Sequence, residues 1–347
     1  MRRILGIESS CDEMAAAVLS VGEGAPRQVL ASVIHSQHEV HAPYGGVVPE
    51  LASRDHVLAV EGVVEQALRE ADLAPDDLDA IAVTAGPGLI GSLLVGLSFG
   101  KALAYRLGIP VVGVHHLVGH LLSAELAEES LAPPYLGLVV SGGHTALYRI
   151  ERDAEPVLLG QTRDDAAGEA FDKVAKLLGL PYPGGPAVSR AARSGRRDAI
   201  AFPRAMKGTP GYEFSYSGLK TAVAIEVERR GTLSPEDVAD VAASFEEAAV
   251  EPLVRQARRA SAAEGLRTIA VVGGVAANAH LRDEMDRAGE ADGFRAVFPP
   301  LALCTDNAAM IAAAGSLLVE RGVRDGLDLN AFSRVPIADA PWRTAIS

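Results

Sequence analysis

The sequence has few cysteines, with only Cys11 and Cys304 among its 347 residues. Two cysteines cannot build the disulfide framework of a small secreted protein, and a chain of this length does not need one. Basic residues are also in deficit, because 32 lysines and arginines stand against 45 acids, a formal net charge of −13. This balance argues against a protein that coats nucleic acid through overall positive charge, although it allows a local basic segment. We expect a reducing, cytoplasmic setting.

Charge is absent from one long stretch, residues 80–100, which is long enough to span a membrane. Five glycines and Pro87 interrupt it, which favours a buried strand, a glycine-proline turn and a small-residue helix instead. The first residues contain Glu8 and lack the apolar segment of a signal peptide. We therefore expect no membrane partner, and the 48% hydrophobic content predicts a sizeable core.

Strand-like and helix-like patterns alternate along the chain, and each of its two parts opens with three strands. The predicted strands are residues 3–8, 15–19, 28–34, 79–84, 111–114, 135–140, 145–150, 156–159 and 268–272. Helices are predicted at 49–71, up to about 107, and at 116–127, 167–178, 218–229 and 235–263, with starts near 276 and 306. The order predicts an α/β fold with two related halves.

The predicted first half is residues 1–130, with a contribution from the helix at about 306–325. The second half is predicted at 131–330, with an irregular basic insertion at about 181–217 and an extended tail at 331–347. Small residues end three predicted strands, at 8–10, 141–143 and 273–274. Glycine suits either a tight turn or the close approach of backbone amides to a phosphate, and three such ends favour nucleotide binding.

Two histidines, His116 and His120, are spaced four apart, which places both imidazoles on one face of a helix. This spacing suits two ligands of one metal ion, but two ordinary core or surface histidines also fit it. No glutamate stands between them, so the zinc-peptidase motif is absent. A third ligand is required, and Asp306 is either that ligand or the N-cap of the helix that follows.

Other polar features are less specific. We expect His35, His38 and His41 to lie in a solvated loop, and Cys11 to be structural because the two acids after it raise its pKa. Residues 61–79 hold seven acids and one base, whereas residues 190–207 hold six bases and one acid. The basic stretch is either a solvated surface or a contact for phosphates.

Motifs spread up to about residue 320 resemble the bacterial tRNA adenosine threonylcarbamoyltransferase (TsaD) family. They are GIESSCDE at 6–13, YGGVVPELASRDH at 44–56, TAGPGL at 84–89, HHLVGH at 115–120, VSGGHT at 140–145, DAAGEAFDK at 165–173, YPGGP at 182–186, FSYSGLKT at 214–221, GGVAAN at 273–278 and CTDN at 304–307. The resemblance implies an actin-like or Hsp70-like ATPase (ASKHA) fold, with two duplicated ribonuclease-H-like halves around a nucleotide cleft. It implies transfer of a threonylcarbamoyl group from L-threonylcarbamoyladenylate to N6 of adenosine 37, in tRNAs that read codons beginning with A, with release of AMP.

The same resemblance implies site residues and ligands. One divalent metal, iron(II) with zinc(II) as the alternative, is expected on His116, His120 and Asp306. An adenine nucleotide is expected in the cleft, as threonylcarbamoyl-AMP or as ATP. The implied substrate contacts are Val139, Val140, Ser141, Gly142, Gly143, Asp172, Gly185 and Asn278. Candidates for the general base are Asp12, Glu13 and Asp172. The basic stretch at 190–207, and not the resemblance, supplies the candidates for tRNA contacts, which are Arg193, Arg196 and Arg197.

The implied partners are tRNA, the paralogous scaffold protein TsaB and the small ATPase TsaE. Two departures from the family pattern stand out: Met14 replaces a frequent threonine, and residues 187–189 lack a frequent acid that follows Gly-Gly-Pro. A scaffold paralogue of the same fold would lack the paired histidines. A metalloendopeptidase would need a glutamate between the two histidines, which this sequence lacks. A sugar kinase or plain ATPase of the same fold would differ from the transferase in the product that it forms.

Overall fold

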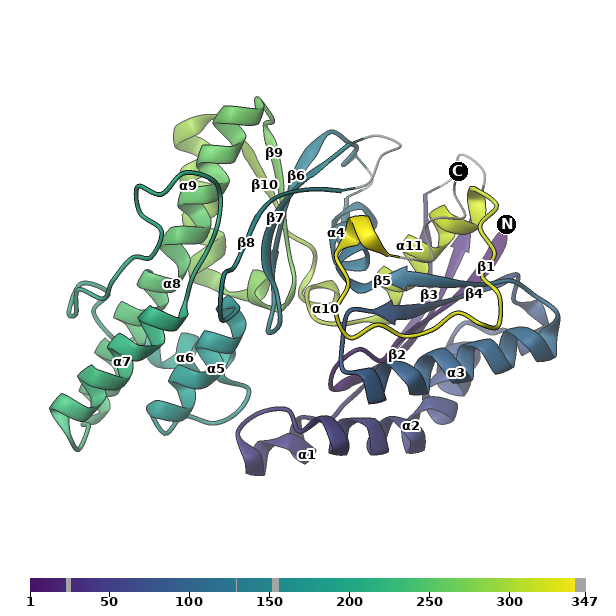
Figure 1. Ribbon diagram of the computed structural model, residues 1–347, viewed down its shortest axis with the longest axis horizontal. Helices are drawn as coiled ribbons and strands as arrows, with labels where there is room; N and C mark the ends of the chain where they lie inside the picture. Colours follow the sequence, from purple (N-terminus) through teal and green to yellow (C-terminus); the bar gives the residue numbers. More distant parts are fainter. Residues whose placement is uncertain (23–25, 129, 152–155, 341–347) are drawn as a thin grey trace. The chain divides into compact units, whose positions relative to one another are not determined.

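The computed structural model describes residues 1–22, 26–128, 130–151 and 156–340 (Figure 1). The chain divides into two compact units, one formed by Met1–Leu131 together with the residues from Thr305 onward, and one formed by Ala132–Cys304. The helix at about 306–325, which was predicted to contribute to the first half, packs on the first sheet and belongs to the first unit. Residues 326–330, which were predicted in the second half, also belong to the first unit.

The first unit is built on a five-stranded sheet with the order β3-β2-β1-β4-β5. Strands β1, β2 and β3 are antiparallel neighbours, while β4 and β5 run parallel to β1. The central strands are apolar and buried, as expected for a sheet covered on both faces. The strands are β1 Arg2–Glu8, β2 Glu13–Val21, β3 Gln28–Ser36, β4 Ala80–Gly86 and β5 Val111–His115.

Helices cover both faces of this sheet. Neighbouring residues of a strand point to opposite faces of the sheet. In β1, Gly6 lies against α11 and Ile7 lies against α3, so these two helices cover opposite faces. Helix α2 packs beside α3, and α4 packs beside α11. The helices of this unit are α1 His38–His41, α2 Pro49–Glu70, α3 Ile90–Leu107, α4 His116–Ala127 and α11 Ala308–Glu320.

Helix α3 is the one described helix long and apolar enough to cross a membrane by length and composition. Its glycines make close contact with the sheet: a Cβ added at Gly100 would lie 2.3 Å from Cγ1 of Val83. A Cβ added at Gly96 would lie 2.4 Å from Oγ of Ser9. The small residues therefore serve helix-on-sheet packing, and the strand, turn and helix predicted for residues 80–100 are confirmed.

The second unit repeats the same topology, with the strand order β10-β9-β6-β7-β8 and the same pattern of parallel and antiparallel neighbours. This repeat confirms the predicted duplication. Strand β10 was missed, because three residues are too few for a periodic pattern. The strands are β6 Tyr135–Val140, β7 Thr145–Ile150, β8 Val157–Gln161, β9 Thr268–Val272 and β10 Arg295–Val297.

The helices of the second unit surround a long central helix, α8, which buries residues along most of its length. The helix predicted near residue 276 is a 3-10 turn, Gly274–Ala277, and the α-helix begins only at Ala279. The insertion at 181–217 contains one short helix, as predicted. The helices are α5 Ala167–Leu177, α6 Gly184–Ala192, α7 Ser217–Arg230, α8 Pro235–Glu264, α9 Ala279–Asp292 and α10 Leu301–Cys304.

Close packing of α11 on β1 depends on Gly6. A Cβ at this position would lie 2.2 Å from the carbonyl oxygen of Ala308, so Gly6→Ala must displace α11. We expect this change to lower the free energy of unfolding by about 1–3 kcal/mol, measured by urea denaturation. The control is Gly62→Ala in α2, where an added Cβ meets nothing within 4 Å among the described residues and should stabilise by about 0.5–1 kcal/mol. Equal effects of the two changes would contradict this packing.

Candidate metal centre and ligand-binding residues

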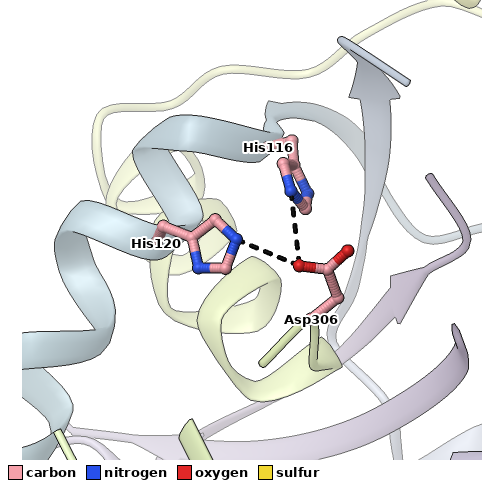
Figure 2. A group of neighbouring side chains, drawn as sticks. All are labelled: His116, His120 and Asp306. Carbon is pink, nitrogen blue, oxygen red and sulfur yellow. Dashed lines mark hydrogen bonds and ion pairs between the residues drawn. The ribbon is translucent and has the colours of Figure 1, made fainter. Parts of the chain in front are cut away.

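His116 and His120 of the HHLVGH motif lie on the first turns of α4, directly after β5. Their rings are 4.7 Å apart between centroids and nearly perpendicular, at 82°. Both are buried, His120 completely. The predicted spacing on one helix face is therefore confirmed, and the two imidazoles turn toward the same point (Figure 2).

Asp306 completes the group from a segment 186 residues further along the chain than His120. Its Oδ1 lies 3.0 Å from Nε2 of His120 and 3.6 Å from Nε2 of His116 (Figure 2). The N-cap alternative is excluded, because Asn307 caps α11 by accepting a hydrogen bond of 3.0 Å from the backbone N–H of Met310. The Asp306 carboxylate is thus available to the histidines.

The approach of α11 to α4 depends on a small residue between the histidines. A Cβ added at Gly119 would lie 2.9 Å from Cδ1 of Ile311 and 3.1 Å from Cγ of Met310.

The ligand atoms of His116, His120 and Asp306 all lie within 4.8 Å of one another. Two imidazole nitrogens and one carboxylate oxygen are a donor set that suits a divalent transition metal and leaves coordination positions open. The three residues therefore fit one metal ion.

Negative charge dominates this centre. Burial lowers the pKa of His116, but the nearby carboxylates of Asp306 and Glu8 outweigh it and raise this pKa to about 9. Burial, followed by the charges of Asp306 and Asp12, raises the pKa of Glu13 well above its ordinary value. Such concentrated carboxylate charge favours a bound cation.

Two of the candidate bases lie beside the start of β2, because Asp12 ends the turn after β1 and Glu13 is the first residue of β2. Together with His38 they place ligand atoms within 4.8 Å of one another. Burial raises the pKa of the neighbouring Cys11 thiol strongly, and Asp12 and Asp306 add to the effect. A thiol held protonated in this way is a poor nucleophile, which agrees with the structural role predicted for Cys11.

A buried polar network holds this turn. Nε2 of His56 lies 3.0 Å from the carbonyl oxygen of Cys11, and its Nδ1 lies 2.7 Å from Nε2 of Gln37. Gln37 also contacts His41, with 3.1 Å between Oε1 and the imidazole Nε2. The expected solvated loop is therefore wrong: His35 lies in β3, and His38 and His41 lie in α1. His35 and His38 are exposed, as a solvated position requires, whereas His41 is fully buried. The spacing of the three histidines could not predict the burial of His41, because the network that holds it includes Gln37 and His56, which do not belong to the histidine cluster.

The predicted substrate residues Val139, Val140, Ser141, Gly142 and Gly143 form the end of β6 and the turn after it. The Ser141 N–H donates to the His144 carbonyl at 2.7 Å, and the His144 N–H donates back to Ser141 Oγ at 3.1 Å. Gly142 and Gly143 are exposed, and a Cβ added at either would meet nothing within 4 Å in the described chain. Their backbone is therefore accessible to a ligand.

The other predicted substrate residues, Asp172, Gly185 and Asn278, also lie in the second unit. Oδ1 of Asp172 accepts a hydrogen bond of 2.8 Å from the Gly184 N–H, and an added Cβ at Gly185 meets open space. The Asn278 side chain caps α9 through Oδ1, and its Nδ2 donates to Oε1 of Glu246 at 2.8 Å. Asn278 therefore has a structural role that the motif did not reveal.

The serine at the second departure from the family pattern joins the same network. Ser189 donates from Oγ to Oε1 of Glu246 at 2.8 Å and accepts from Nδ2 of Asn278 at 2.9 Å. At the first departure, Met14 is fully buried in β2, where it packs in the core of the first unit. A hydroxyl at position 14 would therefore point into an apolar core.

Comparison with known proteins assigns the family. Residues 28–313 match the TsaD family, tRNA N6-adenosine threonylcarbamoyltransferase. The chain belongs to this family. An Anaeromyxobacter dehalogenans (strain 2CP-1 / ATCC BAA-258) protein with that name is 52% identical over 344 residues, which cover 99% of this chain and 100% of the relative. The Symbiobacterium thermophilum relative is 53% identical over 328 residues, 94% of this chain and 95% of the relative.

Solved structures assign the fold. HypF of T. kodakarensis superposes with a TM-score of 0.61 at 16% identity, over 92% of this chain and 48% of HypF. The 2-hydroxyisocaproyl-CoA dehydratase activator of Clostridium difficile, solved with bound ADPNP, gives a TM-score of 0.52 at 14% identity, over 93% of this chain and 99% of the activator. These neighbours and the repeated strand order confirm the predicted ASKHA fold for this TsaD family member.

The basic insertion of this family member is partly neutralised by α8. Nη2 of Arg196 lies 2.5 Å from Oδ2 of Asp240, and Nη1 of Arg197 lies 2.9 Å from Oε2 of Glu246. Both guanidinium groups therefore fasten the insertion to the helix. Arg193, at the end of α6, is exposed. The pairing acids are more than 40 residues away in sequence, so charge counting could not reveal them.

The structure separates the candidate ligand Asp306 from the cap residue Asn307. We expect Asp306→Ala to weaken Zn²⁺ binding strongly, measured by competition with a chromogenic chelator, while leaving thermal stability nearly unchanged. We expect Asn307→Ala to lower the free energy of unfolding by about 0.5–2 kcal/mol through loss of the cap. If Asp306→Ala kept full affinity and lost stability like a cap variant, the assignment of Asp306 as a ligand would be wrong.

Proposed function

We propose that this chain transfers the threonylcarbamoyl group of L-threonylcarbamoyladenylate to N6 of adenosine 37 in tRNAs that read codons beginning with A, and that AMP leaves. The observation that carries this proposal is the triad of His116, His120 and Asp306, assembled in a chain that belongs to the TsaD family. Relatives named for this reaction are about half identical over nearly their whole length. A scaffold paralogue would not need the triad.

We propose iron(II) as the ion held by His116, His120 and Asp306, with zinc(II) as the alternative. A bound divalent ion would supply Lewis-acid charge for the developing negative oxygens of the donor. The buried histidines exclude water from their side of the centre, and Asp306 is the one ligand that is partly exposed, at 19% of its side chain. The donor would therefore approach from the side of Asp306.

The remaining roles follow from the chemistry of the acceptor. The exocyclic amine of adenine is a weak nucleophile, so the enzyme must hold it close to the donor carbonyl and take its proton. Burial and neighbouring acids raise the pKa of Glu13, which makes its carboxylate a stronger base. Asp12 and Glu13 are the candidates for this role, and the adenosine must leave its stack to reach them.

The accessible backbone at Gly142 and Gly143 supports the proposal that the second unit holds the adenylate phosphate. The dehydratase activator of the same fold was solved with bound ADPNP, and a HypF structure with a TM-score of 0.60 is of a phosphate- and nucleotide-bound form. We propose threonylcarbamoyl-AMP as the nucleotide of this chain, with ATP as a second ligand.

We further propose the scaffold paralogue TsaB and the small ATPase TsaE as protein partners, and the cytoplasm as the location. Two adjacent apolar side chains on α2 support a protein partner, because Val57 is 62% exposed and Leu58 is 84% exposed. Exposed aliphatic side chains of this size are common at protein interfaces. Assays of the proposed activity should therefore be run with and without these partners.

The double variant His116→Ala/His120→Ala tests the proposed reaction. We expect it to abolish formation of the modified nucleoside when donor adenylate, unmodified tRNA and partners are supplied, with detection by mass spectrometry. The reason is that both nitrogen ligands of the triad are lost. His35→Ala, which changes an exposed histidine of the same unit, serves as the control and should keep its activity. Full activity in a metal-free double variant would refute the proposal.

Arg193 tests the proposed tRNA surface. Because Arg196 and Arg197 already pair with acids of α8, only Arg193→Glu changes charge without breaking an ion pair of the insertion. We expect weaker tRNA binding and a slope of log K against log salt that is shallower by about 1. Arg106→Glu, which changes an exposed arginine in the last turn of α3, is the charge-matched control. Unchanged affinity and slope in Arg193→Glu would remove this surface from the proposal.

A further inference from the structure

A buried acid outside the triad contacts one of its histidines. Glu8 is the last residue of β1, at the centre of the first sheet, and its side chain is completely buried. Its Oε2 lies 3.0 Å from Nδ1 of His116. We propose that Glu8 is a positioning residue of the metal centre, whose carboxylate fixes the His116 ring so that Nε2 faces Asp306. This inference rests on the metal of the proposed function.

The Glu8 carboxylate is itself held in place. Oε2 also accepts a hydrogen bond of 2.7 Å from the hydroxyl of Thr84 on β4, and Oε1 accepts one of 2.5 Å from the backbone N–H of Ser10. These donors come from the neighbouring parallel strand and from the turn after β1. A buried carboxylate is costly unless its oxygens are satisfied, and here both oxygens are. Its orientation is therefore fixed by the sheet.

The partners of Nδ1 determine which nitrogen of His116 can bind a metal, and Oγ of Ser10 lies 3.2 Å from the same Nδ1 that contacts Glu8. An imidazole that donates its Nδ1–H to a carboxylate keeps the lone pair on Nε2, and this partner also sets the ring plane. In His116, Nε2 is the atom that lies 3.6 Å from Asp306. His120 differs, because its buried Nδ1 has no hydrogen-bond partner within the described chain. Glu8 therefore acts on one histidine of the pair.

The chemistry of glutamine gives a specific test. Glu8 accepts hydrogen bonds on both oxygens, whereas glutamine offers one acceptor oxygen and one donor amide. In either orientation the amide NH₂ of Glu8→Gln would face a donor, either the Ser10 N–H or the pair formed by His116 Nδ1–H and the Thr84 hydroxyl. The change keeps size and shape but removes the charge and one of these contacts.

The experiment measures Zn²⁺ affinity by chelator competition and the visible absorption of bound Co²⁺ on the full chain. We expect Glu8→Gln to lower Zn²⁺ affinity about 10–100-fold and to shift the Co²⁺ bands, because the ligand geometry changes. Thr84→Val, which removes only one support of Glu8, should lower affinity less and shift the bands in the same direction. Asp325→Asn is the control, because this partly buried acid binds the Gly113 N–H in the same unit.

The outcomes separate this inference from the proposed function. His116→Ala should lose metal binding; if it binds Zn²⁺ like the unchanged chain, the metal centre itself is wrong. If His116→Ala loses binding while Glu8→Gln and Thr84→Val keep both affinity and Co²⁺ spectrum, the centre stands and the role of Glu8 is refuted. If Glu8→Gln fails to fold, Thr84→Val decides alone. An Asp325→Asn variant with losses equal to those of Glu8→Gln would also refute a specific role.

Discussion

The close packing of α11 against the first sheet is the constraint on which the metal centre depends. Helix α11 begins two residues after Asp306, and its first residues contact β1 at Gly6. On its other side it meets α4 at Gly119, between the two histidines. Glycine at both positions lets three backbones approach without intervening side chains. The carboxylate that completes the triad is thereby held at 3.0 Å from His120.

This packing concentrates acids that would repel one another without a cation. Burial raises the pKa of Cys11 and of Glu13, and the charge of Asp306 adds to both effects. The same charge raises the pKa of His116 against the effect of burial. Within the triad a protonated histidine could offset this charge, but it must give up that proton to bind a metal. A divalent ion would supply that charge instead. The electrostatics and the donor set thus favour the same ligand.

Much of the fold was predictable from the sequence, because the apolar runs of β1, β4, β6 and β9 are long and the helices between them are periodic. Short elements such as β10 and α10 were missed, since three or four residues carry no period. The paired histidines were also predictable from their spacing. The role of Asp306 was left open, because aspartate is equally suited to a cap and to a ligand. Pairings across the fold, such as Glu8 with His116 and Arg197 with Glu246, required the structure.

Diffraction from crystals of the iron(II)-loaded protein, measured on both sides of the iron absorption edge, tests the metal centre itself. We expect one strong anomalous peak, coordinated by Nε2 of His116, Nε2 of His120 and the carboxylate of Asp306. We also expect the Glu8 carboxylate to stay hydrogen-bonded to Nδ1 of His116. A peak bound by other residues, or none at this triad in a protein that performs the transfer, would contradict this metal centre.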